Sequence, residues 1–222
     1  MKTAHARLDQ HLRVSEIFYS LQGEADSAGW PTVFIRLTGC PLRCSYCDTS
    51  YAFHGGTTIA IADVLTEVAR YPVRHVCVTG GEPLAQGDAC RALLAALCER
   101  RHVVSLETSG ALSIAGIDSR VSRVVDVKSP GSGEMDRNHW SNLDLLTERD
   151  QLKFVLCDRR DYEWAMGQVT ERALASRCMV WFSPVHGRLD PRRLAEWLLE
   201  DGLPVRMQIQ LHKLLWGEAP GH

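Results

Sequence analysis

Three cysteines stand within one short segment, Cys40-Pro41-Leu42-Arg43-Cys44-Ser45-Tyr46-Cys47. Closely spaced thiolates hold iron–sulfur clusters, and a cubane cluster ordinarily takes four of them. Three thiols would leave one iron without a protein ligand, and an open coordination position is typical of a metal centre that does chemistry. A small molecule with paired nitrogen and oxygen donors, such as the amino-carboxylate end of an amino acid, fits that position.

Spacing alone leaves two other interpretations of these thiols open. Together with His54 they would make a zinc site of three cysteines and one histidine. They could also be three ordinary buried thiols, because free cysteine is among the most buried residue types. The other five cysteines lie in apolar or helical patterns, and we predict that they pack in the core: Cys77, Cys90, Cys98, Cys157 and Cys178.

The composition is that of a soluble globular protein. The 222 residues suffice for a sizeable core, and we expect a single domain over residues 1–222. The net charge of −2 gives no electrostatic signature of nucleic-acid or anionic-membrane binding. Met1–Arg7 lacks the apolar region of a signal peptide, and no run is long enough to span a membrane. We therefore predict a cytoplasmic protein without nucleic-acid or membrane partners, in surroundings where clustered thiols indicate metal or redox chemistry.

Strands and helices alternate along the chain. Apolar periodicity predicts helices over residues 61–70, 88–101, 140–149 and 161–174, and Asp190-Pro191 predicts the start of another. Apolar runs predict strands over residues 14–20, 33–37, 75–78, 102–106, 124–127, 151–156, 179–182 and 205–211. Alternation of this kind means parallel pairing through right-handed crossovers. With about six helix-flanked strands, the prediction is an α/β fold, a partial (β/α)6-like barrel rather than a closed eight-fold one.

Polar residues come directly after several of these strands. They are Thr79, Glu107, Ser129, Ser183 and His212, and the cysteine segment also follows a strand. The carboxyl ends of parallel strands meet at one edge, where barrel-like α/β folds carry their active sites. The active site is therefore predicted at that edge.

Two further features bear on the site. Gly80-Gly81-Glu82-Pro83, by itself more often a strand-to-helix bend, would let backbone groups approach a ligand, while Glu82 could take an ammonium group. Arg36 is a charge inside an otherwise apolar strand. It is either paired in the core or directed at an acidic ligand, and the cost of an unpaired buried charge favours a pocket.

The cysteine segment ahead of Gly-Gly-Glu-Pro resembles the radical S-adenosylmethionine superfamily, which implies the partial barrel of that type with truncated helices. Within the superfamily the chain is similar, nearly end to end, to the 7-carboxy-7-deazaguanine synthases. The segments that carry the likeness are Leu21-Gln22-Gly23-Glu24, Arg36-Leu37-Thr38-Gly39-Cys40, Cys47-Asp48-Thr49, Thr79-Gly80-Gly81-Glu82-Pro83, Glu107-Thr108-Ser109-Gly110 and Gln208-Ile209-Gln210-Leu211-His212-Lys213.

This resemblance implies a set of cofactors and their ligands. Cys40, Cys44 and Cys47 would carry a 4Fe–4S cluster whose fourth iron is chelated by S-adenosylmethionine, and the Thr49 hydroxyl would hold magnesium. The residues implied to line the cofactor are Tyr46, Cys47, Asp48, Gly81, Glu82, Ser109, Ser129, Pro130, Gly131 and Ser183. Those implied to contact the substrate, 6-carboxy-5,6,7,8-tetrahydropterin, are Leu21, Gln22, Gly23, Arg36, Thr79 and His212.

The resemblance also implies a radical ring contraction that yields 7-carboxy-7-deazaguanine with loss of ammonia, in the queuosine pathway. The electron would come from an external donor of the flavodoxin or ferredoxin type, and a homodimer is the default for soluble enzymes. Gly131 stands where many relatives have a lysine, which Lys128 or Lys153 would have to replace. The chain also continues beyond Lys213, near which shorter relatives end, as far as His222.

Two other functions remain in consideration. A glycyl-radical activase of the same superfamily would share the cysteines and Gly-Gly-Glu-Pro, but it would not need Leu-Gln-Gly-Glu or Gln-Leu-His-Lys, and it predicts a large exposed partner surface. A zinc or redox module would not be an enzyme. A closed, pterin-sized pocket would favour the synthase.

Overall fold

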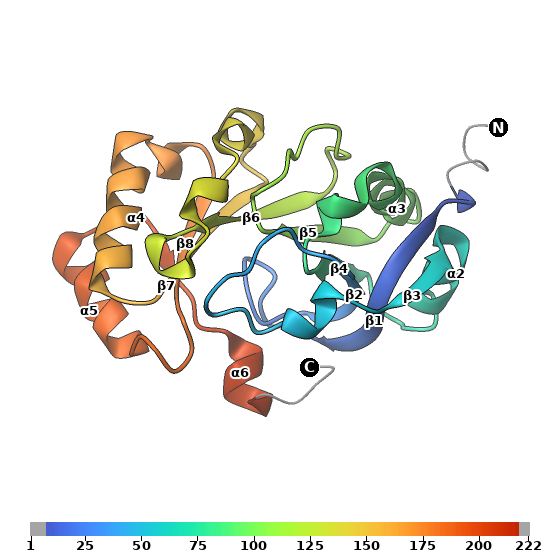
Figure 1. Ribbon diagram of the computed structural model, residues 1–222, viewed down its shortest axis with the longest axis horizontal. Coiled ribbons are helices and arrows are strands. Elements are labelled where there is room, and N and C mark those ends of the chain that lie inside the picture. Colours follow the sequence, from blue (N-terminus) through green and yellow to red (C-terminus); the bar gives the residue numbers. More distant parts are fainter. Residues whose placement is uncertain (1–7, 218–222) are drawn as a thin grey trace.

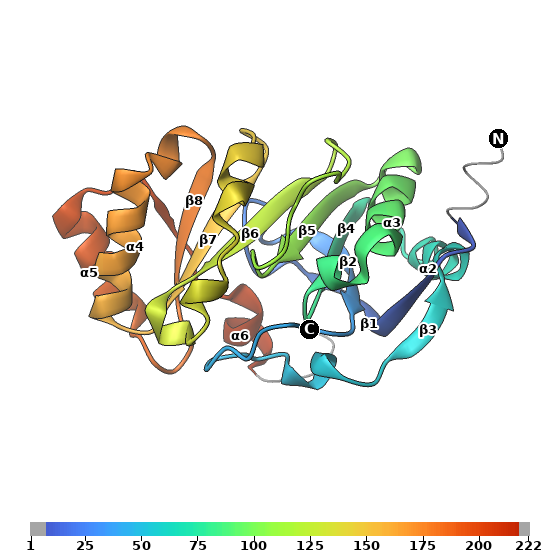
Figure 2. The ribbon, with the colours of Figure 1, turned by 45° about the horizontal axis from the view of Figure 1, so that its top comes forward.

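The computed structural model describes residues 8–217, whose strands form one twisted sheet (Figures 1 and 2). Its order is β3-β1-β2-β4-β5-β6-β7-β8-β9. The strands are β1 (His11–Leu21), β2 (Pro31–Leu37), β3 (Thr57–Ala60), β4 (His75–Gly80), β5 (Val103–Thr108), β6 (Ser122–Lys128), β7 (Gln151–Leu156), β8 (Met179–Pro184) and β9 (Arg206–Met207). Neighbouring strands are parallel from β2 to β9, as predicted, whereas β1 pairs antiparallel with both β2 and β3.

Most of the predicted helices form within a few residues of their expected ends. The helices are α2 (Ile61–Val68), α3 (Gly87–Glu99), α4 (Arg159–Glu171), α5 (Pro191–Asp201) and α6 (Leu211–Trp216). Capping carboxylates begin two of them. Asp158 accepts a hydrogen bond from the Asp161 backbone N–H, and Asp190 accepts one from the Arg192 N–H. These bonds satisfy backbone donors that lack a partner at the start of a helix.

The two faces of the sheet differ because successive residues of a strand point to opposite sides. In β2, Val33, Ile35 and Leu37 belong to the main hydrophobic core, whereas Phe34 and Arg36 line a cavity on the other face. The same alternation continues into the later strands. In β6, Val125 and Val127 are core residues while Val124, Asp126 and Lys128 line the cavity, and in β7 Phe154 lies between the cavity residues Lys153 and Val155.

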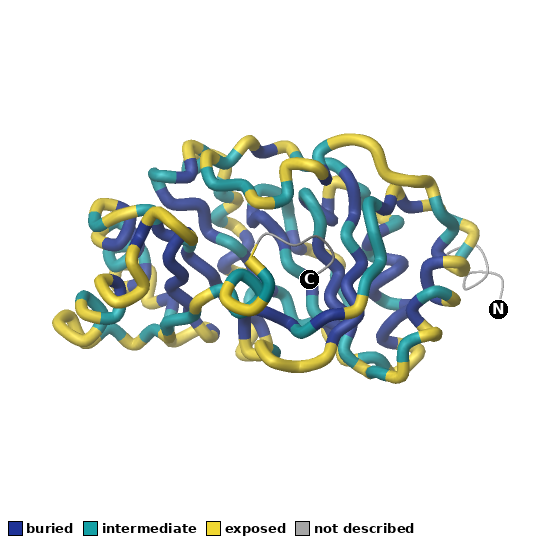
Figure 3. The backbone as a smooth tube through the Cα atoms, turned by 90° about the horizontal axis from the view of Figure 1, so that it is seen from below, coloured by how far each residue is buried: buried dark blue, intermediate teal, exposed yellow. Residues whose placement is uncertain are grey.

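The core therefore lies between the sheet and helices α2 to α5. Each helix contributes apolar side chains to one contiguous cluster, among them Leu65, Leu93, Tyr162 and Leu194. Figure 3 shows that the buried residues follow the strands, whereas exposed residues gather on the loops and outer helix surfaces. The outer face of the sheet holds the molecule together, and the inner face is free to carry polar groups.

The predicted helix over residues 140–149 is wrong. The segment between β6 and β7 instead contains the short 3₁₀ helices η3 (Pro130–Ser132), η4 (Met135–Arg137) and η5 (Trp140–Leu145). Asn142 explains part of the difference, because its buried side chain accepts from the Ile114 N–H and donates to the Leu112 carbonyl. Such side-chain bonds to the backbone compete with helix formation.

The predicted strand over residues 205–211 is also largely wrong, because β9 covers only Arg206–Met207 and α6 begins at Leu211. The Gln208 N–H still donates to the Phe182 carbonyl of β8 at 3.0 Å, but beyond it the segment bonds to the loop after β1. The Gln208 side chain accepts from the Ala25 N–H at 2.7 Å, and the Leu211 N–H donates to the Gly23 carbonyl at 3.1 Å. His212 therefore stands on a helix rather than directly after a strand.

The edge strand β3 has only four residues and was not predicted. Cys77, Cys90, Cys98 and Cys178 are buried as expected, but the prediction for Cys157 is wrong, because it is only partly buried. Met1–Arg7 and the last residues of the C-terminal extension, 218–222, lie outside the described residues. Within residues 8–217 no helix has the length and apolarity needed to cross a membrane.

Candidate active site

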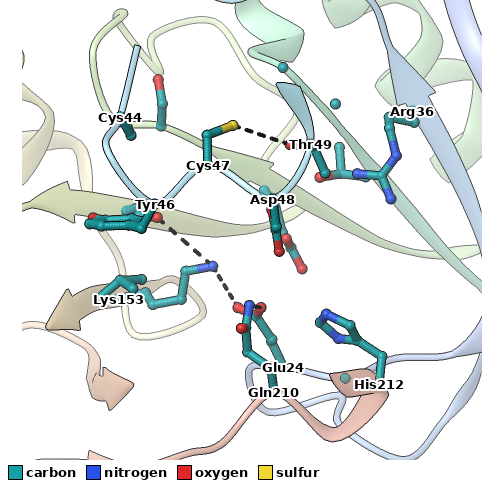
Figure 4. Close-up of a pocket in the computed structure, with 18 of the residues that line it drawn as sticks. Glu24, Arg36, Cys44, Tyr46, Cys47, Asp48, Thr49, Lys153, Gln210 and His212 are labelled. Atoms are coloured by element: carbon teal, nitrogen blue, oxygen red, sulfur yellow. Dashed lines mark hydrogen bonds and ion pairs between the residues drawn. The ribbon is translucent and has the colours of Figure 1, made fainter. Parts of the chain in front are cut away.

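A cavity of about 670 Å³ occupies the inner face of the sheet. Figure 4 shows Cys44 and Cys47 on one side of this space, with Glu24, Gln210 and His212 across from them. The walls come from alternate residues of the strands, and two segments of loop complete the enclosure. We call residues 38–49, between β2 and η1 (Ser50–Phe53), the cluster loop, and residues 22–30, between β1 and β2, the plug.

The cluster loop directs its three thiols toward the cavity. Cys40, Cys44 and Cys47 all line it, each of them partly exposed, and the buried side chain of Leu42 anchors the loop between them. Burial raises the pKa of the Cys44 thiol to about 11 and also raises the pKa of Cys40. Both thiols are therefore protonated near neutral pH, and metal binding releases their protons.

These residues fit an iron–sulfur cluster better than a single metal ion. Among residues 8–217, no three side chains of His, Cys, Asp or Glu converge closely enough to hold one ion. His54, the proposed fourth zinc ligand, does not line the cavity. The three cysteines are all free thiols that face a space large enough for a cluster and a small molecule. Three thiolate donors beside an open volume match a cubane with one iron left for an exogenous ligand.

Gly80 and Gly81 let the cluster loop approach β4. The Gly81 N–H donates to the Leu37 carbonyl, and the next N–H along the chain donates to the Gly39 carbonyl at 2.7 Å. A Cβ on Gly81 would lie 2.4 Å from that Gly39 oxygen and 2.9 Å from the Cβ of Cys40. The Gly-Gly pair is therefore required by the close backbone contact that places the first cysteine.

Glu82 is buried behind this contact and does not line the cavity. Its carboxylate accepts from the Leu84 N–H at 2.9 Å, from the Thr108 hydroxyl at 2.8 Å and from the Ser109 N–H at 2.7 Å, and also from the Ser109 hydroxyl. Glu82 thus joins the end of β4 to the end of β5. Of the neighbouring residues implied to bind the cofactor, Gly81 and Ser109 do line the cavity.

The other residues implied to bind the cofactor divide into two groups. Tyr46, Cys47, Asp48 and Thr49, the last of them the expected magnesium ligand, line the cavity. Ser129, Pro130, Gly131 and Ser183 do not. The Ser129 hydroxyl donates to the Val155 carbonyl at 2.8 Å, and the Gly131 N–H donates to Asp161 at 2.7 Å. Roles for this second group in cofactor binding stay predictions.

Gly131 has a structural reason to be glycine. A Cβ there would lie 2.4 Å from Asp161 Oδ2 and 2.9 Å from the Cys157 sulfur. Lys128 and Lys153, which would have to replace a lysine at this position, both line the cavity, and each is paired with an acid. Lys128 Nζ lies 2.9 Å from Asp126, and Lys153 Nζ lies 2.6 Å from Glu24.

All six residues implied to bind the substrate line the cavity, namely Leu21, Gln22, Gly23, Arg36, Thr79 and His212. Arg36 is 13% exposed, and its Nε donates to Glu16 at 2.6 Å. Within the described residues, its two terminal nitrogens make no hydrogen bond, so they remain available to an acidic ligand. Arg36 is thus paired on one side and directed into the cavity on the other, which combines the two possibilities left open by the sequence.

The plug closes the cavity opposite the cluster loop. The side-chain oxygen Oε1 of Gln22 accepts a hydrogen bond from the Gly23 N–H at 2.8 Å, while the Nε2 of the same side chain donates to Glu107 at 3.1 Å. Farther along, Ala25 has a left-handed backbone with φ of 62°, which costs free energy for a residue with a Cβ and persists only where surrounding contacts fix it. Its N–H is held by Gln208, and the Asp26 N–H is held by the Gln151 side chain at 2.9 Å.

Of the buried charges on the cavity wall, Lys128 and Lys153 were considered from the sequence as replacements for a cofactor-contacting lysine, whereas Glu24 and Asp126 were not identified as site residues. Burial alone would raise the pKa of Glu24, but the Lys153 ammonium and a hydrogen bond from Gln210 lower it to about 2. Burial alone would lower the pKa of Lys153, but Glu24 and Asp126 raise it well above its ordinary value. The pattern that identified Arg36, a charged residue inside an apolar strand, also applies to Asp126, Lys128 and Lys153 and could have identified them as residues of the cavity wall.

Two more titratable groups face this network. Burial raises the pKa of Glu107, which stands beside Gln22. Burial lowers the pKa of His212, which favours a neutral imidazole able to accept a hydrogen bond. The cavity thus offers three thiols and several hydrogen-bonding groups, together with the guanidinium groups of Arg36 and Arg188.

A partial α/β barrel with three thiols beside an open cavity defines a radical S-adenosylmethionine enzyme, and residues 34–124 match the Radical SAM superfamily. The chain is 47% identical to 7-carboxy-7-deazaguanine synthase of Chlorobaculum tepidum, over 92% of this chain and 94% of the relative. It is 39% identical to the enzyme of that name from Koribacter versatilis, over 92% of this chain and 97% of the relative. The chain belongs to the 7-carboxy-7-deazaguanine synthase family.

The fold agrees with a solved structure. The crystal structure of QueE from Escherichia coli superposes with a TM-score of 0.75, covering 96% of this chain and 99% of that one at 23% identity. This likeness confirms the architecture. The cofactors of a radical S-adenosylmethionine enzyme are a 4Fe–4S cluster and S-adenosylmethionine.

Proposed function

We propose that this protein converts 6-carboxy-5,6,7,8-tetrahydropterin to 7-carboxy-7-deazaguanine with loss of ammonia, in the biosynthesis of queuosine. The observation that carries the proposal is the composition of the cavity. The three thiols and all six residues that the sequence implied for substrate binding line the same cavity. None of the relatives described above is a glycyl-radical activase, so the activase alternative has no support.

The chain itself supplies ligands, orientation and exclusion of water. Cys40, Cys44 and Cys47 would hold the cluster, and Thr49 would give its hydroxyl to magnesium, a cation that prefers oxygen ligands. When bound, the cluster and S-adenosylmethionine would supply the radical chemistry that abstracts a hydrogen atom from the substrate, with the electron taken from the external donor. The protein must hold that hydrogen in line with the radical, which is a task of positioning.

Positioning of the pterin falls to the plug and to Arg36. The terminal nitrogens of Arg36 suit a carboxylate, because a guanidinium binds it with two parallel hydrogen bonds. Leu21 to Gly23 line the cavity where the edge of a flat ring would lie, and the pairing of Gln22 with Glu107 fixes their orientation. His212 lies against Gly23, where a Cβ would come within 2.4 Å of its Nδ1. The ring would therefore be held between two packed segments.

Further proposals concern the setting in which the enzyme works. We propose a single domain over residues 1–222, a homodimer, a location in the cytoplasm and a flavodoxin or ferredoxin as electron donor. Each follows from the family and from the composition given above. Gel filtration with light scattering tests the dimer, and reduction of the cluster by purified donors tests the electron source.

One experiment decides the main proposal. Protein reconstituted anaerobically is incubated with S-adenosylmethionine, a reductant, magnesium and the carboxytetrahydropterin, and the products are identified by mass. Formation of 7-carboxy-7-deazaguanine that depends on both cofactor and reductant is expected. A protein that carries four irons and cleaves S-adenosylmethionine but leaves the pterin unchanged would refute the substrate while preserving the class.

A further inference from the structure

The Arg43 N–H of the cluster loop donates to Glu134 at 2.5 Å, and the loop is also attached to the far half of the barrel through Ser45, which lies between the second and third cysteines. All of its polar groups have partners. The Ser45 N–H donates to the Ser132 carbonyl at 2.9 Å, and its hydroxyl donates to the Gly131 carbonyl at 2.7 Å. Both partners lie in the turn after β6, whereas the cluster loop begins at the end of β2. Figure 2 shows this loop running across to that turn.

The remaining groups of Ser45 bind Arg188. Arg188 Nη2 donates to the Ser45 carbonyl at 2.7 Å, and Nη1 donates to the Ser45 hydroxyl at 3.0 Å. Nη1 also lies 3.9 Å from the Cys157 sulfur. The planar guanidinium thus uses two nitrogens on one residue, in the paired geometry that gives arginine its specificity. Arg188 belongs to neither the strands nor the residues implied for substrate or cofactor.

The segment that carries Arg188 is itself fixed. The Val185 N–H donates to the Leu156 carbonyl, and the Arg188 and Leu189 N–H groups both donate back to the Val185 carbonyl. Leu189 is buried in the main core, and Asp190 caps α5 directly afterwards. Arg188 therefore projects from a rigid turn, so no further backbone entropy is lost when its side chain binds Ser45.

We propose that Arg188 is a positioning residue that clamps the cluster loop in its cluster-binding conformation. The proposal rests on the proposed function for the identity of the bound cluster, but the clamp itself is a property of the chain. Because Cys44 precedes Ser45 and Cys47 lies two residues beyond it, release of Ser45 would free both thiols together. Loss of the clamp should then increase local opening of the loop without unfolding the sheet.

Trypsin tests the clamp in the metal-free protein. Arg43 is the only lysine or arginine between Arg36 and Arg70, so cleavage after Arg43 reports opening of the cluster loop. In Arg188→Gln we expect cleavage there to be roughly fivefold faster than in the wild type, the factor given by about 1 kcal/mol of lost hydrogen bonding. Arg192→Gln is the matched control, because Arg192 is an exposed arginine that pairs with Glu196 on α5, and it should cleave at the wild-type rate.

A second readout follows the reconstituted protein. Iron release to a ferrous chelator should be accelerated by roughly the same factor in Arg188→Gln, with an unchanged melting temperature of the metal-free protein. Arg188→Lys keeps the positive charge but has a single donor nitrogen, so it should restore part of the protection against cleavage and iron release. If Arg188→Gln lowers the melting temperature, Ser45→Ala, which removes only the hydroxyl contacts, serves as the test and should raise both rates.

Wild-type rates of cleavage and of iron release in Arg188→Gln, or in Ser45→Ala where that variant is needed, would overturn the proposal. Failure of the proposed function gives a different result. A wild-type chain that takes up no iron would refute the cluster assignment, while the tryptic cleavage of the metal-free variants would still decide whether Arg188 holds the loop.

Discussion

The role of a single residue could be predicted best where a charged side chain stood among apolar neighbours in the sequence. Arg36 was identified because a charge stood in an apolar strand, and the structure places it on the cavity wall with one side paired to Glu16. Asp126 and Lys153 obey the same rule in their own strands. Glu24 gave no such signal, because its pairing with Lys153 joins residues 129 positions apart and depends on how the plug folds back.

Substitution of Arg36 tests its role at the substrate. Arg36→Lys should raise KM about tenfold with a smaller effect on kcat, because an ammonium cannot reproduce the two parallel bonds to a carboxylate. Steady-state kinetics under anaerobic conditions measures the change. Arg120→Lys, in an exposed pair with Asp118, provides the control and should behave as the wild type. An unchanged KM in Arg36→Lys would show that the guanidinium does not bind the substrate.

The pairing of Glu24 should contribute to stability in a pH-dependent manner. The pKa of Glu24 lies near 2 in the folded protein, below its ordinary value of 4.5, so its contribution is complete above pH 4.5 and disappears as the pH falls toward 2. Glu24→Gln should therefore lower the free energy of unfolding by about 3 kcal/mol near neutral pH, and the difference from the wild type should shrink below pH 4.5.

Denaturant unfolding at several pH values measures this difference. Glu163→Gln is the matched control, because Glu163 forms an exposed pair with Arg159 at 2.9 Å, and such pairs contribute at most about 1 kcal/mol. A Glu24→Gln variant as stable as the wild type at neutral pH would contradict the prediction.

At the scale of elements, the periodic segments were predictable and the segments between them were not. Helices α2 to α5 bury a regular apolar stripe, and that stripe is visible in the sequence. Residues 140–149 and 205–211 have apolar residues at suitable spacings, but polar side chains there bond to other loops. Asn142 holds the segment after β5, and Gln208 holds the plug. Local patterns carry no information about such distant partners.

The contact between the cluster loop and β4 provides a test at this scale. In Gly81→Ala the new methyl group would meet the Gly39 carbonyl, and relieving the clash should cost about 1–3 kcal/mol and displace Cys40. Less iron per chain after reconstitution is the expected result. Gly167→Ala is the control, because Gly167 lies within α4 with its nearest neighbour 3.9 Å from the added Cβ, and it should stabilise the protein by about 0.5–1 kcal/mol. Normal iron content in Gly81→Ala would contradict the packing argument.

For the whole molecule, the α/β class, the parallel pairing from β2 onward and the partial barrel followed from the alternation of strands and helices. The antiparallel pairing of β1 did not follow from it, because the residue pattern of a strand does not indicate which way the strand runs in the sheet. The cavity was predicted at the carboxyl ends of the strands, and the cluster loop is there. The plug reaches the same cavity from the opposite end of β2, which strand order alone could not indicate.

The fold should not depend on its metal. The cysteines that would hold the cluster belong to a loop over the inner face, whereas the main core lies between the outer face and the helices. Cys44→Ala should therefore abolish iron binding and turnover, yet change the free energy of unfolding of the metal-free protein by less than about 1 kcal/mol. Iron analysis and chemical denaturation measure the two effects. Full turnover in Cys44→Ala would disprove the ligand assignment.

The division of each strand between two faces has a consequence for how such a protein changes over generations. Every second residue packs in the hydrophobic core, and the residues between them line the cavity in which the reaction takes place. Substitutions at the chemical positions can thus alter which ring system is accepted while the neighbouring positions preserve the architecture. An insertion of one residue within a strand would exchange the two sets beyond that point unless a bulge absorbed it, as the register shift between Val14 and Glu16 does in β1.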